Sequence, residues 1–266
     1  MKHLPWEGKM EPFQLCGNIY FVGTRFASSH IIKTSEGLIL LDSGYQESLY
    51  QVVDSMHRCG LDPMDIRYII HSHGHVDHTG ATRTLVEMTG AKTFIGAKDA
   101  CMVQEEDHFL SWRSELGVAF YPFQVDQLLY DGDRIELGDV VIDCVETPGH
   151  TPGVISFFWD VAFEGKILRA GTMGGAGKNT LTGSYIKQHA LEKEDWRGAY
   201  RRSVERCRQE KVDVFIGNHA GQNQTPERYE RLAAGQKDAF VDDKAWGTFL
   251  DSMERGLAEL ETKDPL

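Results

Sequence analysis

Four histidines and one aspartate lie close together in HSHGHVDHTG at residues 71–80, in a chain with 11 histidines. Imidazoles and carboxylates together are ligands that suit Zn²⁺ in proteins, with Fe or Mn as alternatives. Side chains two residues apart on an extended loop point the same way, so His73 and His75 can bind one ion. Asp77 and His78 project from a later part of the loop, so they can bind a second ion.

The first ion still lacks a ligand, because a catalytic zinc site has about three protein ligands and an open position for water. His150 in ETPGHTPG and His219 in VFIGNHAGQ each follow a predicted strand, as His73 does. The pattern therefore predicts two sites, one of His73, His75 and His150 and one of Asp77, His78 and His219. The remaining histidines lack this context and are predicted to be structural: His3, His30, His57, His71, His108 and His189.

The elements that position these residues fall into two halves rich in β-structure. The short apolar run IRYII predicts a buried strand whose carboxyl end carries the histidine loop, which is where ligand-binding loops gather in α/β sheets. Strands and hairpins are predicted at 13–23, 30–44, 66–70, 92–96, 126–150, 153–160, 166–171 and 212–217. Helices are predicted at 46–59, 79–89, 98–106, 192–210 and, as a long tail, 226–262. This order predicts two sheets packed face to face between outer helical layers, in one domain of residues 1–266.

The composition is that of an ordinary soluble globular protein, and the partner that we expect is a small-molecule substrate. Lys and Arg number 28 against 40 Asp and Glu, without a basic stripe, so we expect no nucleic-acid partner. No apolar run approaches the roughly 20 residues that span a bilayer, so we expect no membrane partner, and residues 1–13 lack the apolar segment of a secretory signal. Five scattered cysteines without CxxC spacing predict free thiols in a reducing compartment. We therefore expect a cytoplasmic protein, whose helical tail offers a contact for a homo-oligomer.

Four motifs resemble, in order, those of the metallo-β-lactamase superfamily: LLDSG (40–44), HSHGHVDH (71–78), TPGHTPG (147–153) and GNHAG (217–221). The segments GNIYFVGT and AFVDDKAW are similar to the third subclass of metallo-β-lactamases and their non-lactamase relatives. The resemblance implies an α/β protein with a four-layer αββα sandwich of two mixed sheets. It also implies the same six metal ligands, and it implies that Asp42 is a buried aspartate that supports the metal loop from behind the ligands.

The chain departs from many binuclear members of this superfamily at one position. Those members carry a bridging aspartate in a Gly-Asp motif, where this chain has Gly171 and Thr172. The third subclass also lacks this bridge and usually has serine there, so Thr172 fits that subclass. The departure implies that the second metal is held less firmly and that its site is partly occupied.

The predicted ligands favour hydrolysis. Three imidazoles on a zinc ion lower the pKa of its bound water to about 7, which gives a hydroxide able to attack a carbonyl. Asp77 is the group best placed to orient the water and take its proton. We predict a metallo-hydrolase with one or two zinc ions that opens a lactam, lactone, ester or thioester. The alternatives are a true β-lactamase, a mononuclear iron oxygenase acting on a thiol or persulfide, and a binding scaffold without turnover.

Three other segments are predicted to shape the substrate pocket. Residues 108–123 are rich in aromatic residues, and we predict that Trp112, Phe120 and Tyr121 form a wall for an apolar substrate. The alternative for this segment is a cap on the core or a subunit contact. Residues 23–30 are predicted to lie near the site, and the glycine-rich residues 174–183 are predicted to form a mobile lid.

Overall fold

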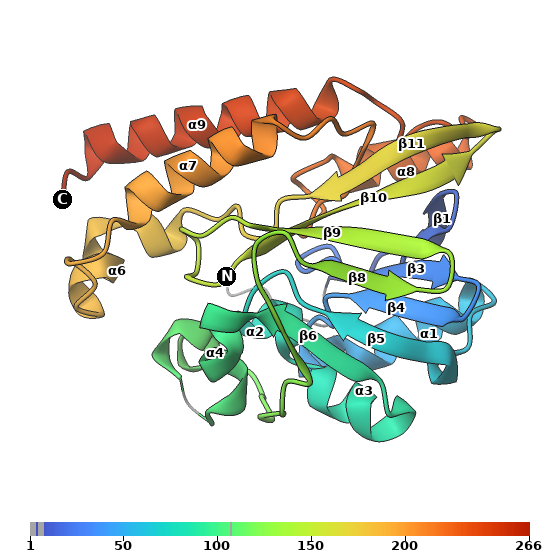
Figure 1. The fold of residues 1–266 in the computed structure, drawn as a ribbon, viewed down its shortest axis with the longest axis horizontal. Helices are drawn as coiled ribbons and strands as arrows, with labels where there is room; N and C mark the ends of the chain where they lie inside the picture. Colours follow the sequence, from blue (N-terminus) through green and yellow to red (C-terminus); the bar gives the residue numbers. More distant parts are fainter. Residues whose placement is uncertain (1–3, 5–7, 107) are drawn as a thin grey trace.

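Two β-sheets lie face to face in the middle of the molecule, and helices cover their outer faces (Figure 1). The structure is a computed structural model that describes residue 4, residues 8–106 and residues 108–266. His3, which the sequence predicts to be structural, lies outside the described residues. The order of layers is helix, sheet, sheet, helix, so the predicted αββα sandwich is confirmed.

The first sheet has seven strands in the order β1-β2-β3-β4-β5-β6-β7. Its pairs are antiparallel from β1 to β4 and parallel from β4 to β7, which makes the sheet mixed. The strands are β1 (Phe13–Cys16), β2 (Ile19–Phe21), β3 (His30–Thr34), β4 (Gly37–Leu41), β5 (Ile66–Ile70), β6 (Lys92–Gly96) and β7 (Gln127–Leu129).

The second sheet has five strands in the order β12-β11-β10-β9-β8 and is also mixed, because only β11 and β12 pair in parallel. Its strands are β8 (Arg134–Leu137), β9 (Val140–Glu146), β10 (Ile155–Phe163), β11 (Lys166–Thr172) and β12 (Val214–Phe215). The two sheets thus follow the two β-rich halves of the sequence with two differences: β7, predicted within the second half at 126–150, pairs with β6 in the first sheet, and β12 is shorter than the predicted strand at 212–217.

Alternation along single strands explains the layers. Successive side chains of a strand point to opposite faces, so Phe157 and Trp159 of β10 pack between the sheets while Phe158 packs under the helices. In β4, Ile39 faces the second sheet and Leu40 faces the helices of the other side. Both faces are buried, which is why these strands are apolar at nearly every position.

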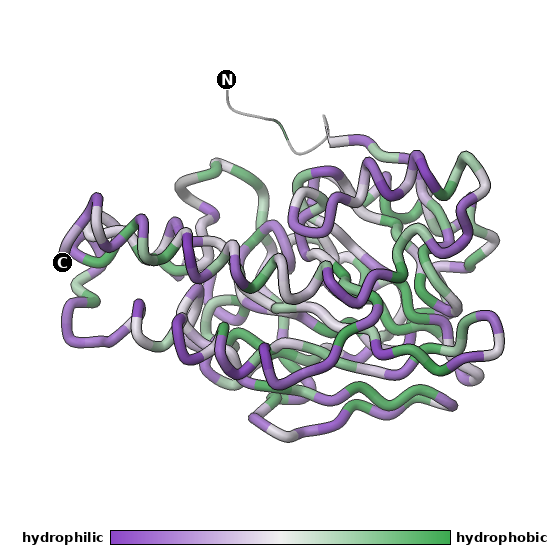
Figure 2. Tube along the Cα trace, turned by 90° about the horizontal axis from the view of Figure 1, so that it is seen from above, coloured by the Kyte–Doolittle hydropathy of each residue, from purple (hydrophilic) through white to green (hydrophobic). Residues whose placement is uncertain are grey.

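Helices α7 (Trp196–Arg208) and α9 (Ala245–Lys263) cover the second sheet, and α1 (Leu49–Arg58) and α3 (Thr82–Thr89) cover the first (Figure 1). Figure 2 shows hydrophilic and hydrophobic residues alternating along the outer helices, as expected for helices with one buried face.

The other helices are α2 (Val76–Thr79), α4 (Ala100–Gln104), α5 (Arg113–Leu116), α6 (Gly183–Gln188) and α8 (Thr225–Ala233). Short 3₁₀ turns occur at η2 (Gln46–Ser48), η3 (Pro63–Asp65), η4 (Ala97–Asp99), η5 (Phe109–Ser111) and η6 (Asn179–Leu181). Across the described residues, no helix is both long and apolar enough to traverse a bilayer.

The predicted continuous tail at 226–262 is wrong, because α8 and α9 are separate helices. Gly235 has φ +100°, a conformation that ends α8 and that side chains rarely adopt. Phe240 then inserts into the core between the sheets, with 2% of its surface exposed. The Arg228 guanidinium pairs with Asp242 at 2.8 Å and fixes the connection. The tail is therefore divided into two helices because Phe240 packs into the core between the sheets.

Candidate metal centre

Loops that leave the strands bring the predicted ligands together. His73 and His75 follow β5, His150 lies between β9 and β10, and His219 follows β12. Within the described part of the chain, two groups have ligand atoms that all lie within 4.8 Å of one another. The groups are His73, His75 and His150, and His73, Asp77 and His78.

The first group is compact and buried. The ring centroids of His73, His75 and His150 lie 4.5–4.8 Å apart, at interplanar angles of 73–79°. The exposed fractions of these residues are 1%, 4% and 5%. Three imidazoles with ligand atoms this close together can supply the three protein ligands of a tetrahedral metal that keeps one open position.

The predicted second site, of Asp77, His78 and His219, is more open. The Asp77 Oδ2 atom lies 3.3 Å from the Nε2 atom of His78 and 3.7 Å from that of His219. The rings of His78 and His219 are 5.0 Å apart and perpendicular. The His219 side chain is 39% exposed, whereas that of His78 is fully buried. The structure therefore places His219 beside Asp77 and His78, but on the solvent side.

Hydrogen bonds to Nδ1 orient the distant ligands. His150 Nδ1 donates to the Gly177 carbonyl oxygen at 2.9 Å, and His219 Nδ1 donates to the Phe26 carbonyl oxygen. A proton on Nδ1 leaves the lone pair of Nε2 available to a metal, so these bonds select the ligating tautomer. Phe26 lies in residues 23–30, and this segment therefore does lie next to the site.

Asp42 supports the other end of the histidine loop. Its Oδ2 atom accepts hydrogen bonds from His78 Nδ1 at 2.8 Å and from the Ser72 hydroxyl at 2.7 Å, and its Oδ1 atom accepts the Ser72 amide at 2.8 Å. The Ser72 oxygen in turn accepts from His73 Nδ1 at 3.0 Å. Asp42 thus orients His78 directly and His73 through Ser72. Its backbone has φ +57°, in the left-handed region that favours glycine.

The unpaired ring nitrogens test whether a metal fits. The Nε2 atoms of His73, His75 and His78 are buried and have no hydrogen-bond partner among the described residues. A buried polar atom without a partner costs on the order of 1–3 kcal/mol, so His73 and His75, which form one group of ligand atoms with His150, indicate a missing shared partner. A cation that accepts the lone pairs of His73, His75 and His150 fits this donor set.

Burial keeps the first group neutral. It lowers the pKa of His73 and His75 well below the usual range for histidine, and the neighbouring imidazoles lower both further. Burial also lowers the pKa of His150 to about 4. Neutral imidazole is the form that binds metal, so the environment maintains the ligating state at neutral pH.

Charges dominate in the second group. Burial disfavours the charged forms of Asp77 and His78, but the His78 ring holds the Asp77 pKa below its usual range. The carboxylates of Asp77 and Asp42 overcome burial and raise the pKa of His78 to about 10. A proton and a metal ion compete for the Nε2 lone pair of His78. Because both are cations, the carboxylates that favour the protonated ring also favour a bound metal ion.

The glycine-rich residues 174–183, predicted to be a mobile lid, are instead packed against His150. A Cβ atom on Gly177 would lie 2.8 Å from Cε1 of His150, and one on Gly175 would lie 2.9 Å from its Cβ. The Tyr200 hydroxyl donates to the Ala176 carbonyl at 2.7 Å and holds the segment in place. The glycines therefore permit close approach to the ligand, and the Gly177 carbonyl is a functional group that composition alone did not identify.

The three predicted wall residues have different surroundings. The Trp112 ring lies 5.9 Å from that of His75, and its Nε1 atom donates to the Tyr185 hydroxyl at 3.3 Å. Phe120 is only 4% exposed and packs in a core cluster with Val76, so the structure places it beneath the loop and away from any wall. Tyr121 is 53% exposed.

Thr172 and His71 stand outside both ligand groups. The Thr172 hydroxyl is buried and has no partner among the described residues. Both ring nitrogens of His71 have partners in the core, Nδ1 with the Phe94 carbonyl at 2.9 Å and Nε2 with the Thr82 hydroxyl at 2.7 Å. His71 therefore ends β5 and points away from the metal ligands.

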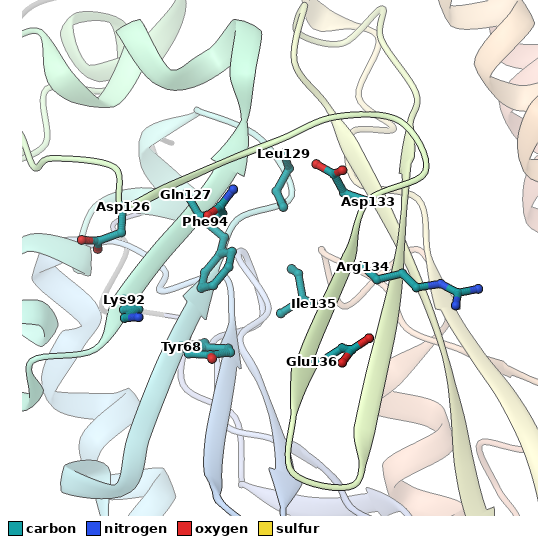
Figure 3. Close-up of a pocket in the computed structure, with 10 residues that line it drawn as sticks. All are labelled: Tyr68, Lys92, Phe94, Asp126, Gln127, Leu129, Asp133, Arg134, Ile135 and Glu136. Atoms are coloured by element: carbon teal, nitrogen blue, oxygen red, sulfur yellow. The ribbon is translucent and has the colours of Figure 1, made fainter.

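A cavity of about 550 Å³ lies elsewhere, beside the edge strands β7 and β8 (Figure 3). It is lined by Tyr68, Lys92, Phe94, Asp126, Gln127, Leu129, Asp133, Arg134, Ile135 and Glu136. This lining has aromatic and mixed charged groups but no imidazole or thiol. The chemistry therefore belongs to the histidine loops and not to this cavity.

Comparison with known proteins decides the family. A sequence model described as the metallo-beta-lactamase superfamily matches residues 22–219. The chain belongs to the metallo-β-lactamase superfamily. The crystal structure of BJP-1, a subclass B3 metallo-β-lactamase of Bradyrhizobium japonicum, is similar with a TM-score of 0.87 and 27% identity, covering 97% of this chain and 96% of that one. The predicted resemblance to the superfamily and to its third subclass is thus confirmed.

The curated relatives match a smaller part of the superfamily domain. An uncharacterized protein of Mycobacterium leprae is 31% identical over 125 residues, which cover 42% of this chain and 57% of the relative. A hydroxyacylglutathione hydrolase of Buchnera aphidicola is 27% identical over 128 residues, which cover 48% of this chain and 41% of that enzyme. The chain therefore matches about half the length of these relatives.

Proposed function

We propose that this chain is a zinc-dependent hydrolase that opens a lactam, lactone, ester or thioester. His73, His75 and His150 would hold the first ion, and Asp77, His78 and His219 would hold a second. The observation that carries the proposal is the first group, in which the ligand atoms of His73, His75 and His150 lie within 4.8 Å of one another and the buried Nε2 atoms of His73 and His75 have no hydrogen-bond partner among the described residues. The superfamily match over residues 22–219 supports the same conclusion.

The chain's own residues would divide the work. When bound, a zinc ion supplies a water that ionises near neutral pH and an electrophilic contact for a carbonyl oxygen. Asp77 is an anion at neutral pH, because the His78 ring lowers its pKa. Its free oxygen can accept a hydrogen bond from the attacking water, hold it in line with the carbonyl and take its proton as the C–O bond forms.

The substrate pocket would lie on the His75 side of the site. Trp112 stands beside His75 and is fixed by its bond to Tyr185, so it presents an aromatic surface next to the reacting carbonyl. We propose that this surface receives the apolar part of a small-molecule substrate. The five cysteines are all free, which supports a reducing, cytoplasmic location.

The relatives suggest two acyl classes. BJP-1 is a β-lactamase, and the Buchnera relative is a thioester hydrolase by its name. Both reactions add water to a carbonyl and release a leaving group, so one metal site serves either. The pocket wall, and not the ligand set, would choose between them.

Metal analysis and a substrate panel test the proposal together. Protein purified without added metal is expected to contain one or two Zn per chain, and to hydrolyse one of nitrocefin, an acyl-homoserine lactone, an aryl ester or a glutathione thioester. A chelator should abolish this activity and Zn²⁺ should restore it, while an exposed-histidine variant, His57→Ala, should behave as the wild type. One Fe per chain with O₂ consumption on a thiol or persulfide would contradict hydrolysis and support an oxygenase. Metal-free protein that binds no Zn²⁺ would contradict the metal centre itself.

A further inference from the structure

Asp99 is a second buried aspartate that contacts the histidine loop, at Gly74, whereas Asp42 contacts the loop at Ser72 and His78. Asp99 ends the 3₁₀ turn η4 after β6, and none of its surface is exposed. Among the described residues, no cation forms an ion pair with it. A buried carboxylate without a counter-ion is costly unless hydrogen bonds satisfy its oxygens. Its donors therefore show what the side chain is for.

The donors come from both segments that supply the first metal site. Asp99 Oδ2 accepts the Gly74 amide at 2.9 Å, and Gly74 lies between His73 and His75. The same oxygen accepts the Thr151 hydroxyl at 2.5 Å, and Oδ1 accepts the Gly153 amide at 2.6 Å. Thr151 directly follows His150 in the chain. One carboxylate thus joins two segments that are far apart in sequence and that meet at a single group of ligands.

Close packing at this junction leaves no room for displacement. A Cβ atom on Gly153 would lie 2.8 Å from Asp99 Oδ1, and one on Gly96 would lie 1.9 Å from the Gly153 carbonyl oxygen. On the other side, a Cβ atom on Gly74 would lie 2.9 Å from the Met102 side chain. The two segments are therefore held at one separation by glycine contacts and by the three hydrogen bonds of Asp99.

We propose that Asp99 is a positioning residue of the first metal site. It fixes the His73–His75 segment relative to the His150 segment, and so it sets the distance between the imidazoles and the affinity of the site. Asp42 acts on His73 and His78 only, so the two aspartates have separate tasks. This inference rests on the proposed function, because it assumes that the three imidazoles share an ion.

The test compares Asp99→Asn with a matched control. Asparagine keeps the size of the side chain but replaces one acceptor oxygen with an NH₂ group. This group cannot accept the hydrogen bonds that the amides and the hydroxyl around Asp99 donate. Asp126→Asn is the control, because Asp126 Oδ2 accepts the amide and hydroxyl of Thr93 at 2.9 and 3.0 Å and contacts neither metal segment. Metal-free proteins are titrated with Zn²⁺ against a chromophoric chelator, and the absorption spectra of the Co²⁺-loaded proteins are recorded.

We expect Asp99→Asn to weaken the first Zn²⁺ affinity by roughly 10- to 100-fold and to shift the Co²⁺ ligand-field bands. Asp126→Asn should leave the Zn²⁺ affinity within about twofold of the wild type and the Co²⁺ bands unchanged, because large effects are expected only where a residue supports the metal ligands. If Asp99→Asn does not fold, Thr151→Val deletes a single donor and should weaken affinity several-fold, with Thr151→Ser restoring it. Wild-type affinity and spectrum in the Asp99 or Thr151→Val variants, or an equal loss in Asp126→Asn, would overturn the proposal. Failure of the wild type to bind Zn²⁺ would instead refute the proposed function.

Discussion

The two candidate metal sites share the histidine loop but differ in how they are enclosed. The first is built from residues that are at most 5% exposed, on segments held by buried aspartates and by the Gly177 carbonyl. The second depends on His219, whose side chain is 39% exposed and whose Nδ1 atom donates to the Phe26 carbonyl oxygen. Thr172 supplies no carboxylate between them. The comparison teaches that one loop can contribute to an enclosed site and to a more exposed one. We expect the enclosed site to bind metal at the lower metal concentration.

The largest effect should follow from opening the first site. In His150→Ala only two imidazoles remain for the ion, so we expect kcat/KM on the hydrolysed substrate to fall on the order of 10³-fold or more, since a catalytic metal supplies several kcal/mol. Steady-state kinetics with metal analysis measure both changes. His57→Ala, on the exposed surface of α1, is the control. Retained activity with full metal content would show that the enclosed site is not the catalytic one.

The pH dependence of stability in the metal-free protein should have opposite signs for His150 of the first site and His78 of the second. The pKa of His150 is about 4 when folded and 6.5 when unfolded, so the unfolded state binds more protons between these values. Its contribution is complete above pH 6.5 and is lost as the pH falls toward 4, by up to about 3 kcal/mol. The pKa of His78 is raised to about 10, so its contribution is complete below pH 6.5 and is lost as the pH rises through 10.

Chemical denaturation of the chelated protein from pH 4 to pH 10 measures these contributions. His150→Gln should flatten the acid side of the curve relative to the wild type, and His78→Gln should flatten the alkaline side. Curves of both variants that run parallel to the wild type would show that the two sites do not differ electrostatically.

The smallest effect should follow from disturbing the open site. His219→Ala removes one exposed ligand and leaves the first site intact, so we expect the Zn content to drop by one ion where two are bound, with kcat/KM lowered about tenfold or less. Metal titration and kinetics at saturating Zn²⁺ measure this. A loss as large as that of His150→Ala would remove the distinction between the sites.

The clustering of the candidate ligands was predictable because each signal is local. A histidine just beyond an apolar strand can be identified from the adjacent residues, and three such strands converge because the sandwich aligns their ends. The groups that orient the candidate ligands were not predictable. Gly177 lies 27 residues from His150 in the sequence, and Asp99 lies 25 residues from Gly74. Each of these contacts uses a backbone carbonyl or amide, which the residue type does not reveal.

Aromatic and glycine content misled the sequence interpretation for a related reason. Phe120 and Trp112 belong to one aromatic segment, but the first lies in the core and the second beside His75. Composition does not encode which face of an irregular segment meets the core. Glycines at 174–177 indicated mobility, whereas they serve close contact with His150. The break in the tail at Gly235 depends on Phe240 reaching a core that only the folded sheets create.

Asp42 also bears on any effort to make this protein more robust. Its left-handed backbone costs on the order of 1 kcal/mol relative to glycine, so a redesign guided by backbone geometry alone would select Asp42→Gly. Such a variant would have a more relaxed turn, but the buried donors of Ser72 and His78 would lose their acceptor at about 1–3 kcal/mol each, so the empty fold would be less heat-resistant. It would also lose the oxygens that align His73 and His78, so the strained residue serves the fold and the candidate site together.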